Sequence, residues 1–174
     1  KLSIVVMAAA CAAALSLSAV AQSKKDSVVM GMTLEPPGLD PTSAAAAAIA
    51  EVTLYNIYET LTKINEDSLV SPLLAESWQA SPDLKTYTFK LRKSVKFQNG
   101  EPFDSAAVKF SFDRAAAPAS TNKDKALFQS FESVTTPDAD TVGIALKYAE
   151  PNLPFLLGQA TAAIVDAKSA ASDA

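Results

Sequence analysis

Apolar and polar side chains alternate most clearly where Tyr87, Phe89 and Leu91 are separated by a threonine and a lysine. A period of two residues is typical of a strand with one buried face. The turn-forming sequence Ser81-Pro82-Asp83 precedes this strand, and Trp78 lies on the segment before the turn. This pattern predicts an antiparallel hairpin, with Phe89 facing the core.

A second hairpin is predicted over residues 133–147, around the turn-forming residues 137–140. Other apolar runs predict strands without a clear partner. The continuous run Val28–Leu34 resembles a strand covered on both faces. It ends at residues 35–41, which contain three prolines and a glycine. Short strands are also predicted over Val95–Phe97, before the Asn99-Gly100 turn, and over Thr161–Val165.

Helical spacing of apolar residues predicts a helix over residues 42–60. Another helix is predicted over residues 105–117, with the Asp104 carboxylate as its N-cap. Pro118 ends this helix because proline cannot continue it. Further short helices are predicted over residues 151–158 and from Asp166 onward, and Phe128 and Phe131 stand at helical spacing.

Within the helix over residues 105–117, apolar and charged side chains are expected on different faces. Val108 and Phe112 share the face predicted to be buried. Lys109 and Arg114 are predicted to be solvated.

Residues 1–21 have the features of a secretory signal peptide: a positive first residue, an apolar stretch and the small residues Ala19 and Ala21 before the cleavage point. An uncleaved transmembrane anchor is the alternative, since the apolar run is nearly long enough to span a bilayer. The serines and the many alanines favour cleavage. Removal of residues 1–21 would also remove Cys11, which is the single cysteine.

Composition restricts the chemistry available to the chain. It contains 15 Lys+Arg and 19 Asp+Glu, a net charge of −4 with a pI near 4.8, which argues against a nucleic-acid partner. It has no histidine, so Ser-His-Asp and Cys-His nucleophile systems and zinc sites of the Cys/His type are excluded. No cofactor or metal site is predicted, and the chain is not expected to be an enzyme.

Two kinds of residue are candidates for ligand contact. Aromatic side chains often form ligand platforms, although their apolar surroundings favour a place in the core. The alanine run 44–48 has two interpretations. It is a low-complexity stretch without a role, or its small side chains leave the backbone accessible to a ligand. The aromatic candidates are Tyr55, Tyr58, Trp78, Tyr87 and Tyr148.

An ordered set of short motifs resembles the family 5 extracellular solute-binding proteins of ABC importers, the peptide/nickel/dipeptide group. The motifs cover nearly all of the chain after residue 21 and follow the family's order. They are Leu34-Glu35-Pro36-Pro37-Gly38-Leu39-Asp40-Pro41, Val52-x-x-Tyr55-x-x-Tyr58-Glu59-x-Leu61, Pro72-x-Leu74-Ala75-Glu76-Ser77-Trp78, Thr86–Arg92, Val95-Lys96-Phe97-x-Asn99-Gly100-x-Pro102-Phe103 and Ala107-Val108-x-Phe110-Ser111-Phe112-Asp113-Arg114.

This resemblance implies an α+β chain that is part of a two-lobed periplasmic-binding-protein fold of type II, family 5. Residues 1–21 are then the signal peptide, and residues 22–43 are the first strand and loop of lobe I. Residues 44–174 form the β-rich α+β subdomain inserted into that lobe. Family members are much longer, so the chain is expected to represent only their first part, with the second lobe outside it.

The resemblance also implies a function. Such a protein is a periplasmic receptor that captures a peptide or other small solute, delivers it to an ABC permease in the inner membrane and is a monomer when complete. Ligand contacts are implied, by position, at Glu35 and at Ala44, Ala45, Ala46 and Ala47, through backbone groups in a β-like manner. A secreted hydrolase or a structural envelope protein of mixed fold is the alternative.

Overall fold

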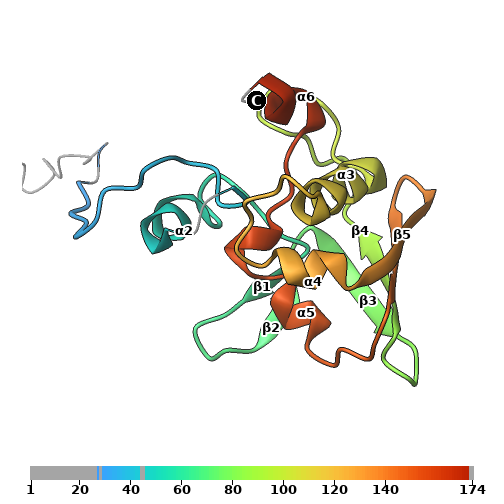
Figure 1. Ribbon diagram of the computed structural model, residues 1–174. Coiled ribbons are helices and arrows are strands. Elements are labelled where there is room, and N and C mark those ends of the chain that lie inside the picture. The colour runs from blue at the N-terminus through green and yellow to red at the C-terminus, as the bar shows by residue number, and fades with distance from the viewer. Residues whose placement is uncertain (1–26, 28, 44–45, 173–174) are drawn as a thin grey trace, which may run out of the picture. The chain divides into compact units, whose positions relative to one another are not determined.

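The computed structural model describes residues 27, 29–43 and 46–172 (Figure 1). The chain divides into two compact units, residues 1–33 and residues 34–174. In the described part of the first unit, residues 29–33 form no strand, and Val29 and Met30 are exposed. The strand predicted over Val28–Leu34 is therefore wrong for its described residues. An apolar run becomes a strand only where a neighbour accepts and donates its backbone hydrogen bonds.

The predicted leader, residues 1–21 with Cys11, lies outside the described residues. Among the residues that are described, no helix is both long enough and apolar enough to span a bilayer.

A four-stranded antiparallel sheet forms the centre of the second unit, in the order β3-β4-β6-β5 (Figure 1). Both predicted hairpins are confirmed, because β3 pairs with β4 and β5 pairs with β6. Trp78 lies opposite Phe89, and Val134 lies opposite Ile144. The strands are β3 (Ala75–Ala80), β4 (Thr86–Leu91), β5 (Phe131–Asp138) and β6 (Thr141–Leu146).

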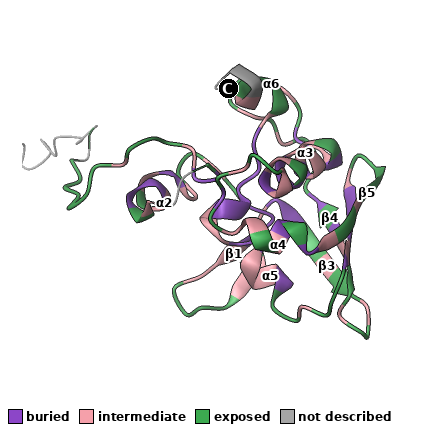
Figure 2. Ribbon diagram, in the orientation of Figure 1, coloured by how far each residue is buried: buried purple, intermediate pink, exposed green. Residues whose placement is uncertain are grey.

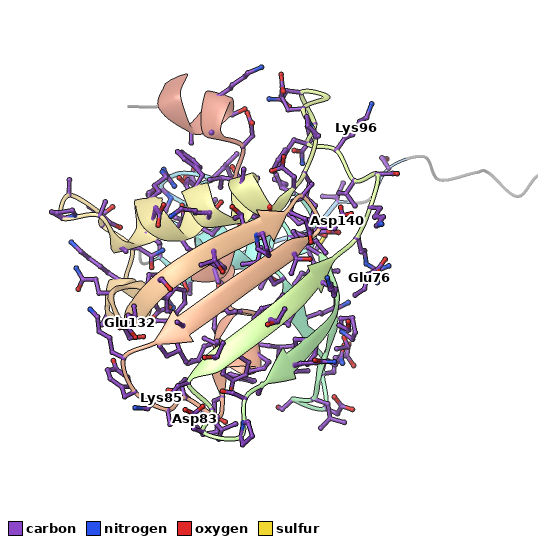
Figure 3. All side chains as sticks on the ribbon, turned by 90° about the vertical axis from the view of Figure 1, so that its right-hand side faces the viewer. Glu76, Asp83, Lys85, Lys96, Glu132 and Asp140 are labelled. Atoms are coloured by element: carbon purple, nitrogen blue, oxygen red, sulfur yellow. The ribbon has the colours of Figure 1, made fainter. Side chains whose placement is uncertain are left out.

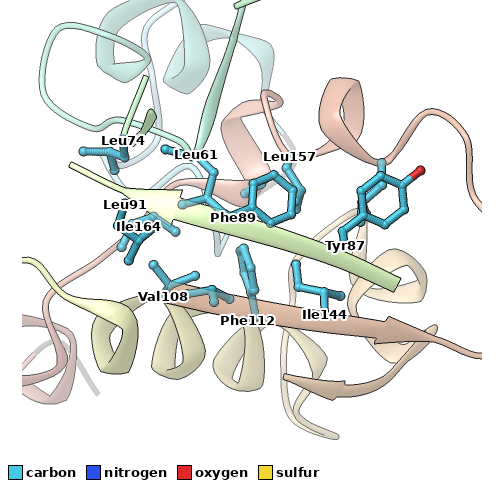
Figure 4. Packing of buried hydrophobic residues seen from close by; sticks show 14 of the residues in the cluster. Leu61, Leu74, Tyr87, Phe89, Leu91, Val108, Phe112, Ile144, Leu157 and Ile164 are labelled. Carbon is cyan, nitrogen blue, oxygen red and sulfur yellow. The ribbon is translucent and has the colours of Figure 1, made fainter. Parts of the chain in front are cut away.

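One face of this sheet carries the core. On β4, Tyr87, Phe89 and Leu91 are buried as their alternation predicts, and Phe89 is 0% exposed. Val142, Ile144 and Leu146 of β6 continue the same apolar face. Figure 4 shows Phe89 and Tyr87 among the buried side chains, and Figure 2 colours the buried residues of the ribbon purple. The opposite face, in front in Figure 3, carries short or polar residues such as Thr88, Gly143 and Thr135.

Helix α3 (Ser105–Ala116) covers the apolar face of the sheet. Its predicted N-cap is confirmed, since Asp104 Oδ1 accepts a hydrogen bond of 3.0 Å from the Ala107 N–H. Val108 and Phe112 are buried, also as predicted. Helix α4 (Lys125–Gln129) follows and adds Phe128, whose ring centroid lies 5.5 Å from that of Phe112. Phe131, predicted on the same helix, instead begins β5.

The remaining elements are short. A second, two-stranded sheet consists of β1 and β2, which were not predicted. Helix α2 is shorter than the helix predicted over residues 42–60. The bounds are α2 (Ala47–Thr53), β1 (Thr62–Ile64), β2 (Val70–Pro72), α5 (Leu153–Leu156), the 3-10 helix η1 (Ala160–Ala162) and α6 (Ala167–Ser172).

Two predicted strands are not formed. Residues 161–165 are buried, but they consist of the end of η1 and a segment that belongs to no strand. A short apolar run indicates burial and does not distinguish a strand from other buried chain. Val95–Phe97 is reduced to an isolated bridge between Lys96 and Pro102.

Candidate functional site

A cavity of about 530 Å³ lies in the second unit, between three segments that are far apart in sequence. The first wall is the loop 55–59 after α2, the second is the loop 95–99 before α3, and the third is the segment 164–170 leading into α6. Asp40, Leu74 and Phe103 complete the lining. A cavity of this size is in the range of small-ligand sites.

The first wall folds tightly because helix α2 ends at Thr53. The carbonyl oxygen of Thr53 accepts hydrogen bonds from the N–H groups of Asn56, Ile57 and Tyr58, at 2.9–3.3 Å. The Tyr55 N–H donates to the Tyr58 carbonyl at 2.8 Å and closes the loop. These bonds reverse the chain and present residues 55–59 to the cavity.

Tyr55 occupies the left-handed region with a φ of 62°, which is uncommon for a residue with a large side chain. Its hydroxyl group accepts a hydrogen bond from the Ile64 N–H at 3.0 Å and donates one to the Gly158 carbonyl at 3.2 Å. The Lys63 ammonium lies 5.2 Å from the centre of its ring. These contacts offset the backbone strain and fix Tyr55 between β1 and the end of α5.

The second wall is built around the predicted Asn99-Gly100 turn. The Gly100 N–H donates to the Phe97 carbonyl, and the Phe97 N–H donates to the Glu101 carbonyl, both at 2.9 Å. Gly100 has a φ of +86°, which favours glycine at this position. The Phe97 ring packs edge-on against Phe103, with centroids 6.3 Å apart. The turn therefore places aromatic side chains along this wall.

Hydrogen bonds join the three walls. Gln98 Nε2 donates to the Ile57 carbonyl at 2.8 Å, and the Ile164 N–H donates to the Glu59 carbonyl at 2.9 Å. Asn99 Nδ2 donates to Asp166 Oδ2 at 2.7 Å. The cavity is thus held open by contacts between segments rather than by one element alone.

Asp40 connects the cavity to helix α3. Its carboxylate accepts hydrogen bonds from the N–H and the hydroxyl group of Thr42, at 2.8 and 2.6 Å, and from Arg114 Nη2 at 2.8 Å. Burial favours the neutral carboxyl, but the bonds from Thr42 and Arg114 outweigh it and hold the pKa of Asp40 below its ordinary value. The prediction of a solvated Arg114 is wrong, because its guanidinium is engaged in this half-buried ion pair.

The lining combines apolar and aromatic side chains with a few charges. Two carboxylates are already bonded within the protein, Asp40 to Arg114 and Asp166 to Ser169 and Asn99. Glu59 and Lys96 are exposed. Within the described part of the chain, no group of three or more acidic, histidine or cysteine side chains could hold a metal ion. This arrangement suits binding of a solute with an apolar part and charged groups.

Of the five residues predicted to contact ligand, the three that the structure describes, Glu35, Ala46 and Ala47, do not line this cavity. Glu35 is exposed in the proline-rich loop, Ala46 is the N-cap residue of α2, and Ala47 is its first, exposed residue. Ala44 and Ala45 lie outside the described residues. The role of these five residues stays a prediction.

Among the aromatic candidates, Tyr55 and Tyr58 line the cavity. Trp78 and Tyr87 pack in or against the core, and Tyr148 is exposed. Sequence reasoning missed the contribution of the loop 95–99 to a site. The Asn-Gly turn signal located the loop, but not the segments that it faces.

Comparison with known proteins gives the class of this chain. The family described as "Bacterial extracellular solute-binding proteins, family 5 Middle" matches residues 70–174, which is more than half of the chain. The chain belongs to this family.

One relative by sequence is the glutathione-binding protein GsiB of Escherichia coli (strain K12). It is 36% identical over 115 residues, which are 66% of this chain and 21% of the relative. The chain therefore spans about a fifth of the length of the curated relatives that it matches.

Solved structures of the same class confirm the α+β fold. AgaA from A. tumefaciens strain R10, in complex with agropinic acid, superposes with a TM-score of 0.74 and 32% identity, covering 80% of this chain and 28% of AgaA. OppA from Haemophilus influenzae, in complex with the peptide RPPGFSPFR, has a TM-score of 0.73 and 24% identity, covering 79% of this chain and 30% of OppA.

Proposed function

We propose that the protein is the periplasmic solute receptor of an ABC importer, and that it captures peptide-like solutes for a permease in the inner membrane. The family match over residues 70–174 carries this proposal, because the members of the family are described as extracellular solute-binding proteins. The name of GsiB specifies glutathione, and the OppA structure holds a peptide, which together favour a peptide-like ligand.

The cavity, and its closeness in sequence to the ligand contacts predicted at Ala44–Ala47, support a binding role. Asp40, which lines the cavity, is tied to Thr42 in the loop that leads to Ala44–Ala47. Helix α2 begins at Ala47 and leads directly into the first cavity wall. We infer that the backbone of Ala44–Ala47 offers hydrogen bonds to an extended solute.

A chimaeric receptor tests this function. The stretch of E. coli GsiB that matches this chain is replaced by the corresponding 115 residues, and glutathione binding is measured by calorimetry. We expect a folded chimaera that binds glutathione within about tenfold of the parent affinity, a change of roughly 1.4 kcal/mol. A folded chimaera without glutathione binding would contradict the proposal.

The alternative of a hydrolase is tested with the chain itself. The purified chain is incubated with a mixed pool of short peptides, and the pool is analysed by mass spectrometry over time. We expect all peptides to be recovered intact, because a receptor releases its solute unchanged. Cleavage products that increase with protein concentration would favour the hydrolase.

A further inference from the structure

Asn99 and Gly100 form the single Asn-Gly pair in the chain, and they lie in the exposed turn of the second cavity wall. Asparagine followed by glycine is chemically labile in proteins. Glycine has no side chain to hinder attack of its backbone nitrogen on the preceding side-chain amide. The other four asparagines, Asn56, Asn65, Asn122 and Asn152, are each followed by a residue with a side chain.

The side-chain amide of Asn99 links this turn to the start of helix α6. Its Nδ2 donates to Asp166 Oδ2 at 2.7 Å and to Ser169 Oγ at 3.3 Å. Its Oδ1 accepts from the Glu101 N–H at 3.0 Å. The amide is therefore a donor toward one carboxylate and an acceptor within its own turn. Figure 1 shows α6 beside this loop, above helix α3.

The start of helix α6 is held by polar contacts. Its residues 167–169 are exposed, so burial contributes little to holding these three residues in place. Two contacts to the loop are the bond from Asn99 to Asp166 and an ion pair between Lys168 and Glu101. Asn99, Asp166 and Ser169 also line the cavity, so this contact joins its second and third walls.

We propose that Asn99 is a site of spontaneous deamidation, and that its conversion to an acidic residue releases helix α6 from the cavity wall. The Gly100 backbone nitrogen loses its proton to solvent base and bonds to Cγ of Asn99. Nδ2 takes a proton back from the protonated solvent base, the bond from Cγ to Nδ2 breaks, and ammonia leaves. Water opens the resulting five-membered imide and gives aspartate or isoaspartate at position 99. This inference does not depend on the proposed transport function.

The reaction would change the interaction of residue 99 with Asp166 from attractive to repulsive. Hydrogen bonds from the Ser169 backbone and side chain and from Asn99 outweigh a smaller effect of burial and hold the pKa of Asp166 below its ordinary value, so it is a carboxylate at neutral pH. A second carboxylate at position 99 removes the donor and places like charges side by side. Lys168 offers limited compensation, because Glu101 already engages it.

The native fold restrains the reaction. The Gly100 N–H is bonded to the Phe97 carbonyl, and the leaving amide of Asn99 is bonded to Asp166. Both bonds must break before the nitrogen can attack. The deamidation rate of the folded protein therefore reports how often this loop opens.

The site is tested by incubating the chain at mildly alkaline pH, folded and in denaturing urea, and by mapping deamidated peptides with mass spectrometry. We expect deamidation at Asn99 in both conditions, at least tenfold faster in urea. Asn56, exposed but followed by a β-branched isoleucine, is the internal control and should stay intact over the same period. An unmodified Asn99 in the folded chain after its complete reaction in urea would overturn the proposal.

The consequence is tested by hydrogen exchange in variants. Asn99→Asp should speed amide exchange in α6 roughly tenfold, as expected when a hydrogen bond to a charged group is lost. In the double variant Asn99→Asp with Asp166→Asn, the new amide donates to the new carboxylate, so exchange should return to the parent rate. Asparagine is also a good N-cap, which keeps the start of the helix satisfied. Parental exchange in the single variant, or no recovery in the double variant, would overturn the release of α6.

Discussion

Arg114 and Asp40 form an ion pair across 74 residues of sequence, with 2.8 Å between Arg114 Nη2 and Asp40 Oδ2. The pair ties the proline-rich loop to helix α3, which packs on the sheet. Both side chains are about 30% exposed, so solvent weakens the interaction without removing it. The pair fixes one side of the cavity, because Asp40 lines it.

Arg114→Met should destabilise the protein by roughly 1–2 kcal/mol. The substitution keeps much of the apolar stem but removes the donor to a partly desolvated carboxylate. Lys109→Met on the same helix is the control, because Lys109 forms an exposed pair with Asp113 one turn away and should cost at most about 0.5 kcal/mol. Urea unfolding at neutral pH measures both. Equal midpoints for the two variants would contradict a structural role for the Arg114 pair.

The contribution of Asp40 to stability should disappear in acid. Because the pKa of Asp40 is lower in the folded protein than in the unfolded chain, its stabilising effect is complete above the unfolded pKa of about 3.9. It is lost as the pH falls through the folded pKa. The difference in unfolding free energy between the parent and Asp40→Asn should therefore be constant near neutral pH and shrink below about pH 4. A difference that grows in acid would contradict this sign.

Phe89→Ala should cost roughly 3–5 kcal/mol, because Phe89 is fully buried at the centre of the sheet face. Lys90→Ala, at the neighbouring exposed position, should cost less than about 1 kcal/mol. The Lys90 ammonium donates a hydrogen bond of 2.7 Å to the Thr141 hydroxyl group, which is a modest loss. Chemical unfolding of the two variants measures these losses of stability. Equal losses would show that the strand does not place Phe89 inside and Lys90 outside.

Two glycines should respond differently to alanine. A Cβ at Gly158 would lie 2.9 Å from Ile64 Cγ1 and 3.3 Å from two backbone oxygens, so Gly158→Ala should cost roughly 1–3 kcal/mol. A Cβ at Gly143 would meet the Thr135 hydroxyl oxygen at 2.5 Å, but that exposed side chain can rotate away. Gly143→Ala should therefore stay within about 1 kcal/mol of the parent. Thermal unfolding measures the stability of both variants. A larger loss of stability in Gly143→Ala than in Gly158→Ala would contradict the tighter packing around Gly158.

Local patterns predicted the two hairpins and helix α3, because the interactions that form them join residues close in sequence. Alternation placed Phe89 inside, and a carboxylate at Asp104 capped a helix that starts at the next residue. The helix predicted over residues 42–60 was too long, since Tyr55 leaves the helical region and bonds instead to β1 and Gly158. Those partners are distant in sequence, so no local pattern contained them.

The cavity could not be predicted for the same reason. Its walls come from residues 55–59, 95–99 and 164–170, and hydrogen bonds between segments set their spacing. The resemblance to known receptors instead drew attention to Glu35 and Ala44–Ala47. The described ones among them do not line the cavity. A family motif identifies residues by their position in the sequence, whereas the walls of a cavity are set by contacts between distant segments.

Residues 22–174 alone should bind di- to pentapeptides no better than millimolar. A receptor of two lobes encloses its solute and excludes water, and this chain spans 28% of AgaA and 30% of OppA. Backbone hydrogen bonds from one open wall are each worth about 0.5–1.5 kcal/mol net. A few of them fall short of the roughly 8 kcal/mol that micromolar binding requires.

Calorimetry with a mixed peptide pool measures this affinity, with E. coli GsiB and glutathione as the positive control. We expect no saturable heat below millimolar peptide for the chain alone, and clear saturation for the control. The Asp40→Asn variant should be indistinguishable from the parent in this assay, because neither encloses the solute. Saturable micromolar binding by the parent chain would mean that the cavity of about 530 Å³ is a complete site by itself. The solute would then be bound without a second lobe.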